Sequence, residues 1–517
     1  MNQMKIFLTL SYFFLIKFIS ADINIRGYNE GYKIEKNIIT FFKDDDYYIS
    51  GIDFDKSIII NCSCQIYLSD LTLISRGSLT PIIIEKNYTV TLTLEGQSIL
   101  IDSEGNENEG VIYLKEKSKL IIGDQSHWCN YNYYQNGILN IIPNKLYGIK
   151  GEGSTSFICN GPYLKIISTS NNAGGIYIGK NITFEFCNFF YDGISGKNHA
   201  IESEDDFIFI ISGNYNINSE NGKGIKTRDN LYIGRKGDSN SNLVININTL
   251  DEGIESKDIE IFSGTINING KKNGISAIND ICKNQKCSGN CNCYIKFYDG
   301  IININSEKNG IISNGDLFII GGQLKLFGSS TENDQPIKKD GVFKIKGGTF
   351  LYGGNYNIAG GLTINSSQTE FSYNQYISEK TFLRIYDNND DINEIKEIIS
   401  IKIPINIQFL YFNYTCSNFT IKCGEKEIGN SENQIRALIT SESETEQETE
   451  YSTISPTDKE NSQVLPSNSN GGKNHIPLDS SKNKNYIEND NIINNNNICL
   501  FIRKSTILLF LFWATLF

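Results

Sequence analysis

The stretch GIESKDIEIFSGTINING, residues 253–270, contains one complete copy of the pattern that predicts the fold. It begins with a Gly-Ile pair and continues into two runs in which apolar and polar residues alternate, separated by Gly264. Alternation with a period of two is typical of β-strands, because successive side chains of a strand point to opposite faces. The stretch therefore predicts two short strands joined by a tight turn at a glycine.

This unit recurs between residues 195 and 354. Its first half is found at 199–203, 223–227, 252–256, 273–277 and 309–313, with a weaker copy at 335–339. Recurrence of a strand pattern about every twenty residues, apart from insertions, is the signature of a solenoid, in which each unit buries its apolar face only against its neighbours. We predict an all-β fold, a right-handed single-stranded parallel β-helix. A β-propeller is disfavoured because each blade needs roughly forty residues or more.

Three pieces of the repeat resemble a known family. They read GIESKDIEIFSGTINING at 253–270, GIKTRDNLYIG at 224–234 and GISAIND at 274–280. They are similar to the repeats of bacterial extracellular carbohydrate-binding proteins, which read like D-G-I-x-S-x-x-x-I-x-I-x-G-G-x-I-x-I. The resemblance implies a pectate-lyase-like β-helix, binding of acidic and neutral plant cell-wall polysaccharides, and bound calcium ions. It covers 195–354 well and 90–194 only loosely.

The resemblance places calcium ligands at the turn before each Gly-Ile pair. Calcium prefers roughly six to eight oxygen ligands, and one turn carries the acidic pair Asp251-Glu252. The equivalent turns carry Lys223, His199 or an asparagine. Asp251 and Glu252 are therefore candidate calcium ligands, with solvated turn residues as the alternative. We predict no other cofactor.

Polar residues of the strands are candidate glycan ligands. Asn246, Asn267 and Asn303 occupy the same place in three copies of Ile-Asn-Ile-Asn, so stacked strands would align them into an amide ladder suited to hydroxyl groups. The alternative is that they form the wet side of amphipathic strands, since the chain is rich in Asn throughout. Aromatic residues would either stack on sugar rings or fill corners of the core: Tyr232, Phe262, Phe297, Tyr298, Phe327 and Tyr352.

The composition excludes some classes of partner. The 517 residues carry a formal net charge of −12, and nucleic acid as a partner would need a basic stripe. Acidic polysaccharides would also be repelled unless calcium bridges them. A lyase or glycosidase needs a base beside calcium or two carboxylates at a defined separation, and neither can be identified.

The two ends of the chain predict export and attachment. Residues 1–21 read as a secretory signal peptide. Residues 439–497 form a Ser/Thr/Glu/Asn-rich stalk with too little apolar material to fold. The apolar tail 498–517 resembles a lipid-anchor signal; a transmembrane helix is the alternative, but Arg503 and Lys504 would lie inside it. We expect a secreted protein at the extracellular face of the plasma membrane or cell wall, attached to membrane only through this anchor.

Between the two ends we predict three segments. Residues 22–194 form an N-terminal cap and irregular coils, and 195–354 form the regular repeats with a cysteine-rich insertion at 281–294. Residues 355–438 form C-terminal coils and a cap. Such caps are expected because an open coil end exposes unpaired strand edges.

An exported protein can carry disulfides and N-linked glycans. The disulfide candidates are Cys62, Cys64, Cys129, Cys159, Cys187, Cys282, Cys287, Cys291, Cys293, Cys416 and Cys423. The four cysteines between 282 and 293 favour a two-disulfide knob over a zinc site, and Cys416 and Cys423 would close a hairpin. The remaining pairings stay open. Acceptor sequons begin at Asn61, Asn87, Asn181, Asn365, Asn413 and Asn418.

The sequence thus predicts a surface protein that binds polysaccharide, of plant cell-wall type or acidic, without transforming it. Two alternatives remain: a surface adhesin or structural wall protein, and a polysaccharide lyase or hydrolase on the same fold.

Overall fold

The computed structural model describes residues 23–430 with gaps. The gaps are 28–29, 78, 105–108, 125–136, 145, 171, 194–197, 239–240, 279–292, 329–335, 356–362, 365–368, 379, 388–395, 405–406, 415–418 and 425. The chain divides into two compact units, Met1–Glu442 and Ser443–Phe517, and every described residue belongs to the first. The predicted signal peptide, stalk and anchor lie outside the described residues. Among the residues described, no helix is long and apolar enough to cross a membrane.

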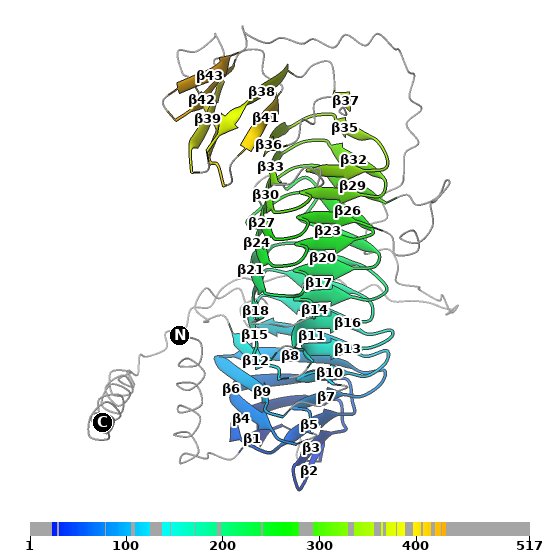
Figure 1. Cartoon of the computed structure of the whole chain (residues 1–517). Coiled ribbons are helices and arrows are strands. Elements are labelled where there is room, and N and C mark those ends of the chain that lie inside the picture. Colours follow the sequence, from blue (N-terminus) through cyan, green and yellow to red (C-terminus); the bar gives the residue numbers. More distant parts are fainter. Residues whose placement is uncertain are drawn as a thin grey trace, which may run out of the picture. The chain divides into compact units, whose positions relative to one another are not determined.

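Each coil of the central stack consists of three short strands. In one coil these are β25 (Ile254–Ser256), β26 (Asp258–Ile261) and β27 (Thr265–Gly270). Each pairs in parallel with a strand of the next coil: β28 (Ile275–Ala277), β29 (Tyr294–Phe297) and β30 (Ile301–Ser306). The chain therefore winds through three columns of parallel strands, which Figure 1 shows stacked coil upon coil.

We number the three columns 1, 2 and 3. After the Gly-Ile turn, the chain of each coil passes first through column 3, then through column 1 and then through column 2. Column 3 contains β3 (Ile38–Phe41), β5 (Ser57–Ile60), β7 (Ile82–Ile84), β10 (Ile112–Leu114), β13 (Tyr147–Gly151), β16 (Gly174–Ile178), β19 (Ile201–Ser203), β22 (Ile225–Thr227), β25, β28, β31 (Ile311–Ser313) and β34 (Ile337–Lys339). Column 1 contains β8 (Thr89–Glu95), β11 (Lys119–Asp124), β14 (Ser156–Asn160), β17 (Ile182–Glu185), β20 (Ile208–Ile210), β23 (Asn230–Ile233), β26, β29, β32 (Asp316–Ile319) and β35 (Phe343–Ile345). Column 2 contains β9 (Gln97–Asp102), β12 (Ile138–Ile142), β15 (Tyr163–Ser168), β18 (Cys187–Gly193), β21 (Gly213–Ser219), β24 (Val244–Thr249), β27, β30, β33 (Gln323–Gly328) and β36 (Thr349–Gly354).

The interior of the coils is filled by the apolar half of the alternation. Along column 2, Ile247, Ile268 and Ile304 are in register on successive coils and are at most 1% exposed. The Gly-Ile turn brings backbones together: a Cβ added to Gly253 would lie 2.6 Å from the carbonyl oxygen of Gly274 in the next coil. Only a very small residue fits this turn, which explains why the phrase recurs.

Both ends of the stack change from parallel to antiparallel pairing. At the N-terminal end, β1 (Asn24–Arg26) pairs with β4 (Asp46–Asp53) and β2 (Tyr32–Glu35) pairs with β3; β4 and the long β6 (Cys64–Ser75) precede columns 1 and 2. At the C-terminal end, β36 pairs with β41 (Ile407–Tyr414), which pairs with β38 (Thr369–Ile377), and β37 (Thr363–Ile364) extends column 1. A separate antiparallel sheet contains β39 (Phe382–Asp387), β40 (Lys396–Lys402), β42 (Phe419–Cys423) and β43 (Lys426–Asn430). A second core cluster packs this sheet against Phe327 and Leu351 of the last coils.

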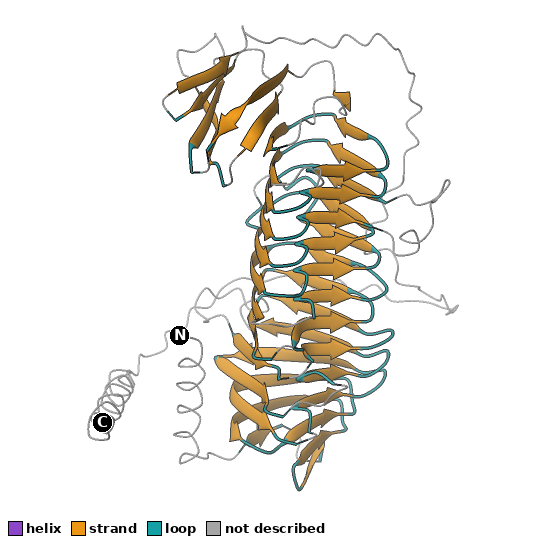
Figure 2. Cartoon of the chain, viewed as in Figure 1, coloured by secondary structure: helices purple, strands orange, loops and turns teal. Residues whose placement is uncertain are grey.

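The predicted all-β architecture with stacked parallel strands is confirmed, and Figure 2 shows strands joined by loops throughout the described residues. The arrangement is consistent with a β-helix. The three-strand coil is already present at β7, β8 and β9, so the stack extends further toward the N-terminus than the Gly-Ile phrase indicates. The coil of β7, β8 and β9 has the strand alternation at residues 89–102 but lacks the Gly-Ile pair, which in column 3 first appears at Gly148-Ile149 and again at Gly175-Ile176.

Candidate functional site

The first candidate surface is a row of amides on the outward side of column 2. Asn267 Nδ2 donates to Asn246 Oδ1 at 2.8 Å, and Asn303 Nδ2 donates to Asn267 Oδ1 at 2.7 Å. At the other end, Asn246 Nδ2 donates to Asn216 Oδ1 at 2.9 Å. The strand register places these residues directly beside one another, and Lys325 follows Asn303 in the same row. The structure thus brings the three predicted asparagines together; their role in glycan binding stays a prediction.

A second row of amides runs beside the first, two residues further along each strand. Asn248 Nδ2 donates to Asn218 Oδ1 at 3.0 Å, and Asn269 Nδ2 donates to Asn248 Oδ1 at 2.9 Å. We call the two rows the amide ladders. A side-chain amide has two N–H donors and an oxygen with two lone pairs, and an internal ladder position uses one of each. The second N–H and the second lone pair of such a position are not used by the ladder.

The second candidate surface lies on the outward side of column 1. Phe209 and Tyr232 are neighbours in register, with ring centroids 5.8 Å apart. Phe262 and Tyr298, just after β26 and β29, are stacked with centroids 5.0 Å apart and an interplanar angle of 21°. We call the half-buried rings of this surface the aromatic face: Phe209, Tyr232, Phe262, Tyr294, Tyr298 and Phe318.

The other aromatic residues that the sequence offered for sugar stacking belong to the interior. Phe297 is 1% exposed, Phe327 is 2% exposed and Tyr352 is 0% exposed. A buried ring cannot meet a sugar ring without opening the coil, so the corner-filling alternative applies to these three. Tyr232, Phe262 and Tyr298 have the partial exposure that stacking requires.

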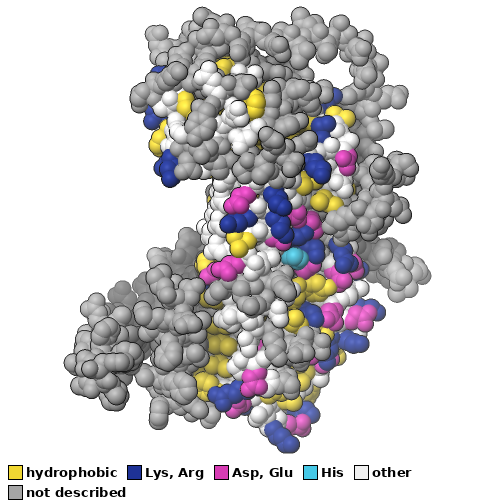
Figure 3. All heavy atoms as spheres, viewed as in Figure 1, with side chains coloured by type: hydrophobic (Ala, Val, Ile, Leu, Met, Phe, Trp, Pro, Cys, Tyr) yellow, Lys and Arg dark blue, Asp and Glu magenta, His cyan; other side chains and the backbone are white. Residues whose placement is uncertain are grey.

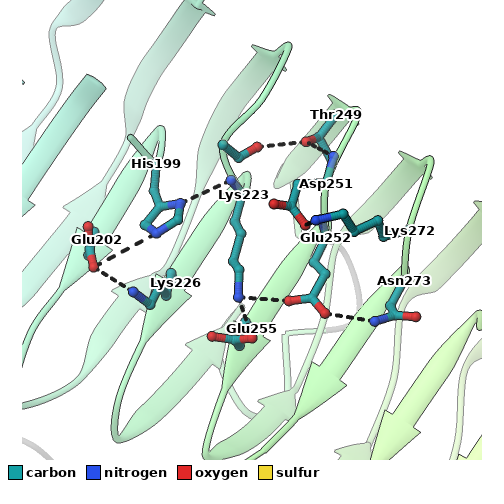
Figure 4. Close-up of polar contacts among 11 residues, drawn as sticks. His199, Glu202, Lys223, Lys226, Thr249, Asp251, Glu252, Glu255, Lys272 and Asn273 are labelled. Carbon is teal, nitrogen blue, oxygen red and sulfur yellow. Dashed lines mark hydrogen bonds and ion pairs between the residues drawn. The ribbon is translucent and has the colours of Figure 1, made fainter. Parts of the chain in front are cut away.

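The third candidate surface is a cluster of charged residues at the Gly-Ile turns and on column 3. In three successive coils, the pair formed by a small residue and Ile is preceded by His199, Lys223 and Glu252, respectively. Glu202, Lys226 and Glu255 are in register on β19, β22 and β25. We call these six residues the turn cluster, and Figure 4 shows their contacts. Figure 3 shows acidic and basic side chains gathered around a histidine on the face in view.

Lys223 joins the two carboxylates of the turn cluster. Its Nζ lies 2.8 Å from Glu252 Oε2 and also donates a hydrogen bond to Glu255, while Asn273 donates to Glu252 Oε1 at 2.7 Å. Burial alone would raise the pKa of Glu252, but hydrogen bonding with Glu255 and the ammonium group of Lys223 outweigh it and lower that pKa to about 2. Burial and the neighbouring Glu252 raise the pKa of Glu255. Both side chains are therefore held in place by one buried cation.

His199 and Glu202 continue the network toward earlier coils. His199 Nδ1 accepts a hydrogen bond from the backbone N–H of Lys223 at 3.0 Å. Lys226 Nζ donates to Glu202 Oε1 at 2.8 Å, and the hydroxyl of Tyr147 donates to Glu202 Oε2 at 3.0 Å. These contacts link neighbouring coils at a fixed register, which is a structural role for the cluster.

Sequence reasoning missed Lys226, Glu202 and Glu255 as members of a site. They directly follow Ile225, Ile201 and Ile254, at the same place in each repeat unit. The signal that reveals them is charge of alternating sign at one fixed position of successive coils, which stabilises cross-strand pairs.

The two carboxylates that the sequence predicts as calcium ligands form ion pairs with lysines. Asp251 Oδ1 lies 2.9 Å from Lys272 Nζ and accepts the backbone N–H of Glu252 at 2.9 Å, and Glu252 is bound by Lys223. Within the described ranges, no three His, Cys, Asp or Glu side chains are grouped as metal ligands would be. Two ammonium groups at the same carboxylates repel a divalent cation, so this donor set does not fit calcium.

The burial of His199 predicts a pH dependence of stability. Burial lowers the pKa of this imidazole to about 4 from an ordinary 6.5, so the unfolded chain binds a proton that the folded chain excludes between these pH values. Stability should therefore fall as the pH drops from 6.5 to 4, by up to about 3 kcal/mol. The variant His199→Asn, with the residue found at Asn273, should lose much less over this range.

The measurement is the free energy of unfolding in urea at pH 7 and pH 4.5 for both proteins. Glu202, Lys223, Lys226 and Asp251 surround the imidazole and are present in both, so their own titration cancels in the comparison. Equal pH dependence of wild type and variant would show that His199 is protonated normally in the fold.

Six of the candidate cysteines lie within the described residues, and the structure brings two of them, Cys159 and Cys187, close together. The Sγ atoms of Cys159 and Cys187 lie 2.6 Å apart in the interior of adjacent coils. Cys62 and Cys64 are neighbours whose thiols interact with each other, and this hydrogen bond lowers the pKa of Cys62. Cys129, Cys282, Cys287, Cys291 and Cys416 lie outside the described residues. Of the predicted knob only Cys293, which is 1% exposed, is described, and of the predicted hairpin pair only Cys423.

Four of the predicted glycosylation sequons lie in the described part of the chain. Asn61 and Asn87 are exposed and Asn181 is half-buried, and their glycosylation stays a prediction. Asn413 in β41 is 0% exposed, and its burial leaves no room for a glycan on Nδ2, which corrects the prediction for this residue. Asn365 and Asn418 lie outside the described residues.

Comparison with protein families places a match on these coils. A family model described as "Carbohydrate-binding domain-containing protein" matches residues 187–368. The matched segment runs from β18 past β36 and so contains the amide ladders, the aromatic face and the turn cluster. Comparisons with curated proteins and with solved structures gave no match.

Proposed function

We propose that the coils within residues 187–368 bind polysaccharide without transforming it, and that the amide ladders are the main binding surface. The observation that carries the proposal is the pair of hydrogen-bonded amide rows, one over β21, β24, β27 and β30 and the other over β21, β24 and β27. The family match over the same coils supports it.

The chemistry of the ladders suits a long glycan. Strands of adjacent coils lie about 4.8 Å apart, so the second N–H and lone pair of the internal amides recur at a short, regular interval along the stack, whereas Asn303 Oδ1 at the end of the first row is buried. A polysaccharide presents hydroxyl groups, each both donor and acceptor, at regular intervals along its own chain. The ladder bonds also fix the amide side chains, so little conformational entropy is lost when a glycan binds.

Binding is favoured over catalysis by the state of the carboxylates. Glu252 and Glu255 have pKa values shifted in opposite directions, which is the pattern of an acid and base pair. Lys223, however, forms contacts with both carboxylates and would have to leave before either could act on a substrate. We therefore assign the turn cluster to the stability of the coils.

The finer features of the fold and location also belong to this proposal. We infer that the three parallel columns form a right-handed, pectate-lyase-like β-helix, supported by the repeat and by its one-directional winding. The sequence of the ends supports export through residues 1–21 and attachment through 498–517, at the extracellular face of the plasma membrane or cell wall. Calcium binding stays a prediction, and we do not assign it to Asp251 and Glu252.

The role of the ladders is tested by removing the two middle amides of the first row. In the double variant Asn246→Ala and Asn267→Ala, we expect polysaccharide affinity to fall roughly tenfold or more, because each lost hydrogen bond contributes about 0.5 to 1.5 kcal/mol. The matched control is Asn140→Ala. Asn140 projects from the same column in β12 but lies outside the matched segment, and its side chain bonds backbone at 3.5 Å instead of a ladder.

The measurement is the dissociation constant of the full-length protein for soluble polysaccharide, with the unfolding midpoint of each variant as a check on folding. A double variant that folds normally and binds as tightly as wild type would remove the ladders from the binding surface.

A further inference from the structure

Two buried cysteines meet at the corner where column 1 turns into column 2. Cys159 lies in β14 and Cys187 begins β18, so they belong to adjacent coils. Both are 0% exposed, and their Sγ atoms lie 2.6 Å apart. The strand register does not pair them, because Cys159 is opposite Phe184 and Cys187 is opposite Gly213. Their side chains therefore meet through the interior, between one column and the other.

The distance between the two sulfur atoms is too short for a packing contact. Carbon atoms in contact lie about 3.5 to 4.0 Å apart, and sulfur is the larger atom. A disulfide bond is about 2.0 Å long, which is about 0.6 Å less than the separation of these two sulfurs. The backbone thus already holds Cys159 and Cys187 at a separation that suits a covalent bond.

The surroundings of the pair are aromatic and closed to solvent. Phe157 and Phe189 lie two residues from the cysteines on the same strands. Phe184 packs against both of these rings and against Tyr215, with centroid separations of 5.8, 5.8 and 5.5 Å. Each of the four rings is at most 1% exposed. Within the described residues no third His, Cys, Asp or Glu joins the pair as a metal ligand would.

The other described cysteines are placed elsewhere in the fold. Cys62 and Cys64 interact with each other near the N-terminal end. Cys293 directly precedes β29, and Cys423 ends β42 in the separate antiparallel sheet. Among the cysteines that the structure describes, Cys187 is therefore the one that suits Cys159.

We propose that Cys159 and Cys187 form a disulfide that links two adjacent coils through the interior. The bond forms by thiol–disulfide exchange: the thiolate of one cysteine attacks an external disulfide and displaces one thiol, and the thiolate of the other attacks the mixed disulfide and displaces the second. The two cysteines lose two protons and two electrons, and the external disulfide takes them up as two thiols. Because both sulfurs are 0% exposed, the exchange takes place before these coils close.

The bond ties the family-matched segment to the coil that precedes it. Cys187 is the first residue of the match over 187–368, and Cys159 lies 28 residues earlier. A cross-link that closes a loop of this length restricts the unfolded chain and lowers the unfolding constant by roughly a hundredfold or more. This link is independent of what the coils bind.

The direct test is a non-reduced proteolytic digest of full-length protein that was folded with oxidised glutathione. Free thiols are first alkylated in denaturant, and the peptides are analysed by mass spectrometry. We expect one species that joins the peptides containing Cys159 and Cys187 and that separates on reduction. Alkylation of both cysteines, or a link from either to glutathione or to another cysteine such as Cys129, would overturn the proposal.

Variants distinguish a bond from a packing contact. Cys159→Ala and Cys187→Ala each remove the same bond, so either one should raise the unfolding constant in urea as much as the double variant does, roughly a hundredfold. With dithiothreitol in the urea, the difference between wild type and double variant should shrink to the cost of the two lost sulfur atoms. Losses that add in the double variant, or a difference that dithiothreitol leaves unchanged, would show two thiols in contact and no bond.

Discussion

Replacing Lys223 by Met is expected to destabilise the coils by about 3 to 5 kcal/mol, because it leaves Glu252 and Glu255 buried beside each other without a cation. The Lys223 side chain is 16% exposed, and the two carboxylate side chains are 11% and 8% exposed. Solvent therefore cannot replace the lost ammonium group without opening the turn. The measurement is the free energy of unfolding in urea at pH 7.

The matched control for this prediction is Lys271→Met. Lys271 pairs with Glu307 at 3.8 Å, but the two side chains are 58% and 63% exposed, and exposed pairs contribute at most about 1 kcal/mol. The pKa of Glu252 is depressed, so its contribution is present above pH 4.5 and is lost as the pH falls toward 2. The difference in free energy of unfolding between Lys223→Met and wild type should therefore become smaller below pH 4.5. Similar losses for both lysine variants would contradict a buried role for Lys223.

Replacing Gly213 by Ala is expected to cost about 2 to 5 kcal/mol, from backbone strain and from overpacking. Gly213 begins β21 with a φ of 113°, which L side chains rarely adopt. A Cβ at this position would also overlap the carbonyl oxygen of Cys187 in the preceding coil. Because that oxygen belongs to the backbone of a stacked strand, it cannot move aside cheaply.

The matched control separates strain from overpacking. Gly237 also has a positive φ, 80°, but a Cβ there would have nothing within 4 Å. Gly237→Ala should therefore show only the cost of strain, about 1 to 2 kcal/mol. Equal losses of unfolding free energy in the two variants would mean that the coils separate to accept the extra methyl group.

The fold was predictable because each coil repeats the same local chemistry. The Ile-Asn alternation at 245–248, 266–269 and 302–305 specifies which side chains enter the core and which face outward. The Gly-Ile phrase marks the turn at which backbones approach most closely, as Gly253 shows. Together they imply stacked parallel strands and place Asn246, Asn267 and Asn303 in one row.

The aromatic face was harder to predict because the two sides of a strand differ by one residue. Phe297 and Tyr298 are adjacent in sequence, but Phe297 is in register with Ile261 and points into the core. Tyr298 stacks on Phe262 at the outward corner. A shift of one residue exchanges inside and outside, and the insertion at 281–294 conceals the register of β29 with β26.

The turn cluster was partly hidden for a different reason. Glu252 was identified as a candidate metal ligand from its acidic neighbour Asp251, whereas its partner Lys223 lies one coil earlier. Insertions between coils change the sequence separation of such pairs, so no fixed spacing reveals them. The repeat alignment shows that these positions are neighbours, and the structure shows that Glu252 pairs with Lys223 and Asp251 with Lys272.

The most direct test of the central claim is retention of the folded full-length protein on cellulose and xylan. The account predicts that the protein is retained, with chelator present or absent, and that soluble oligosaccharides from the same glycan release it. The result that would contradict the account is a folded, β-rich protein that passes through cellulose, xylan and polygalacturonate without retention.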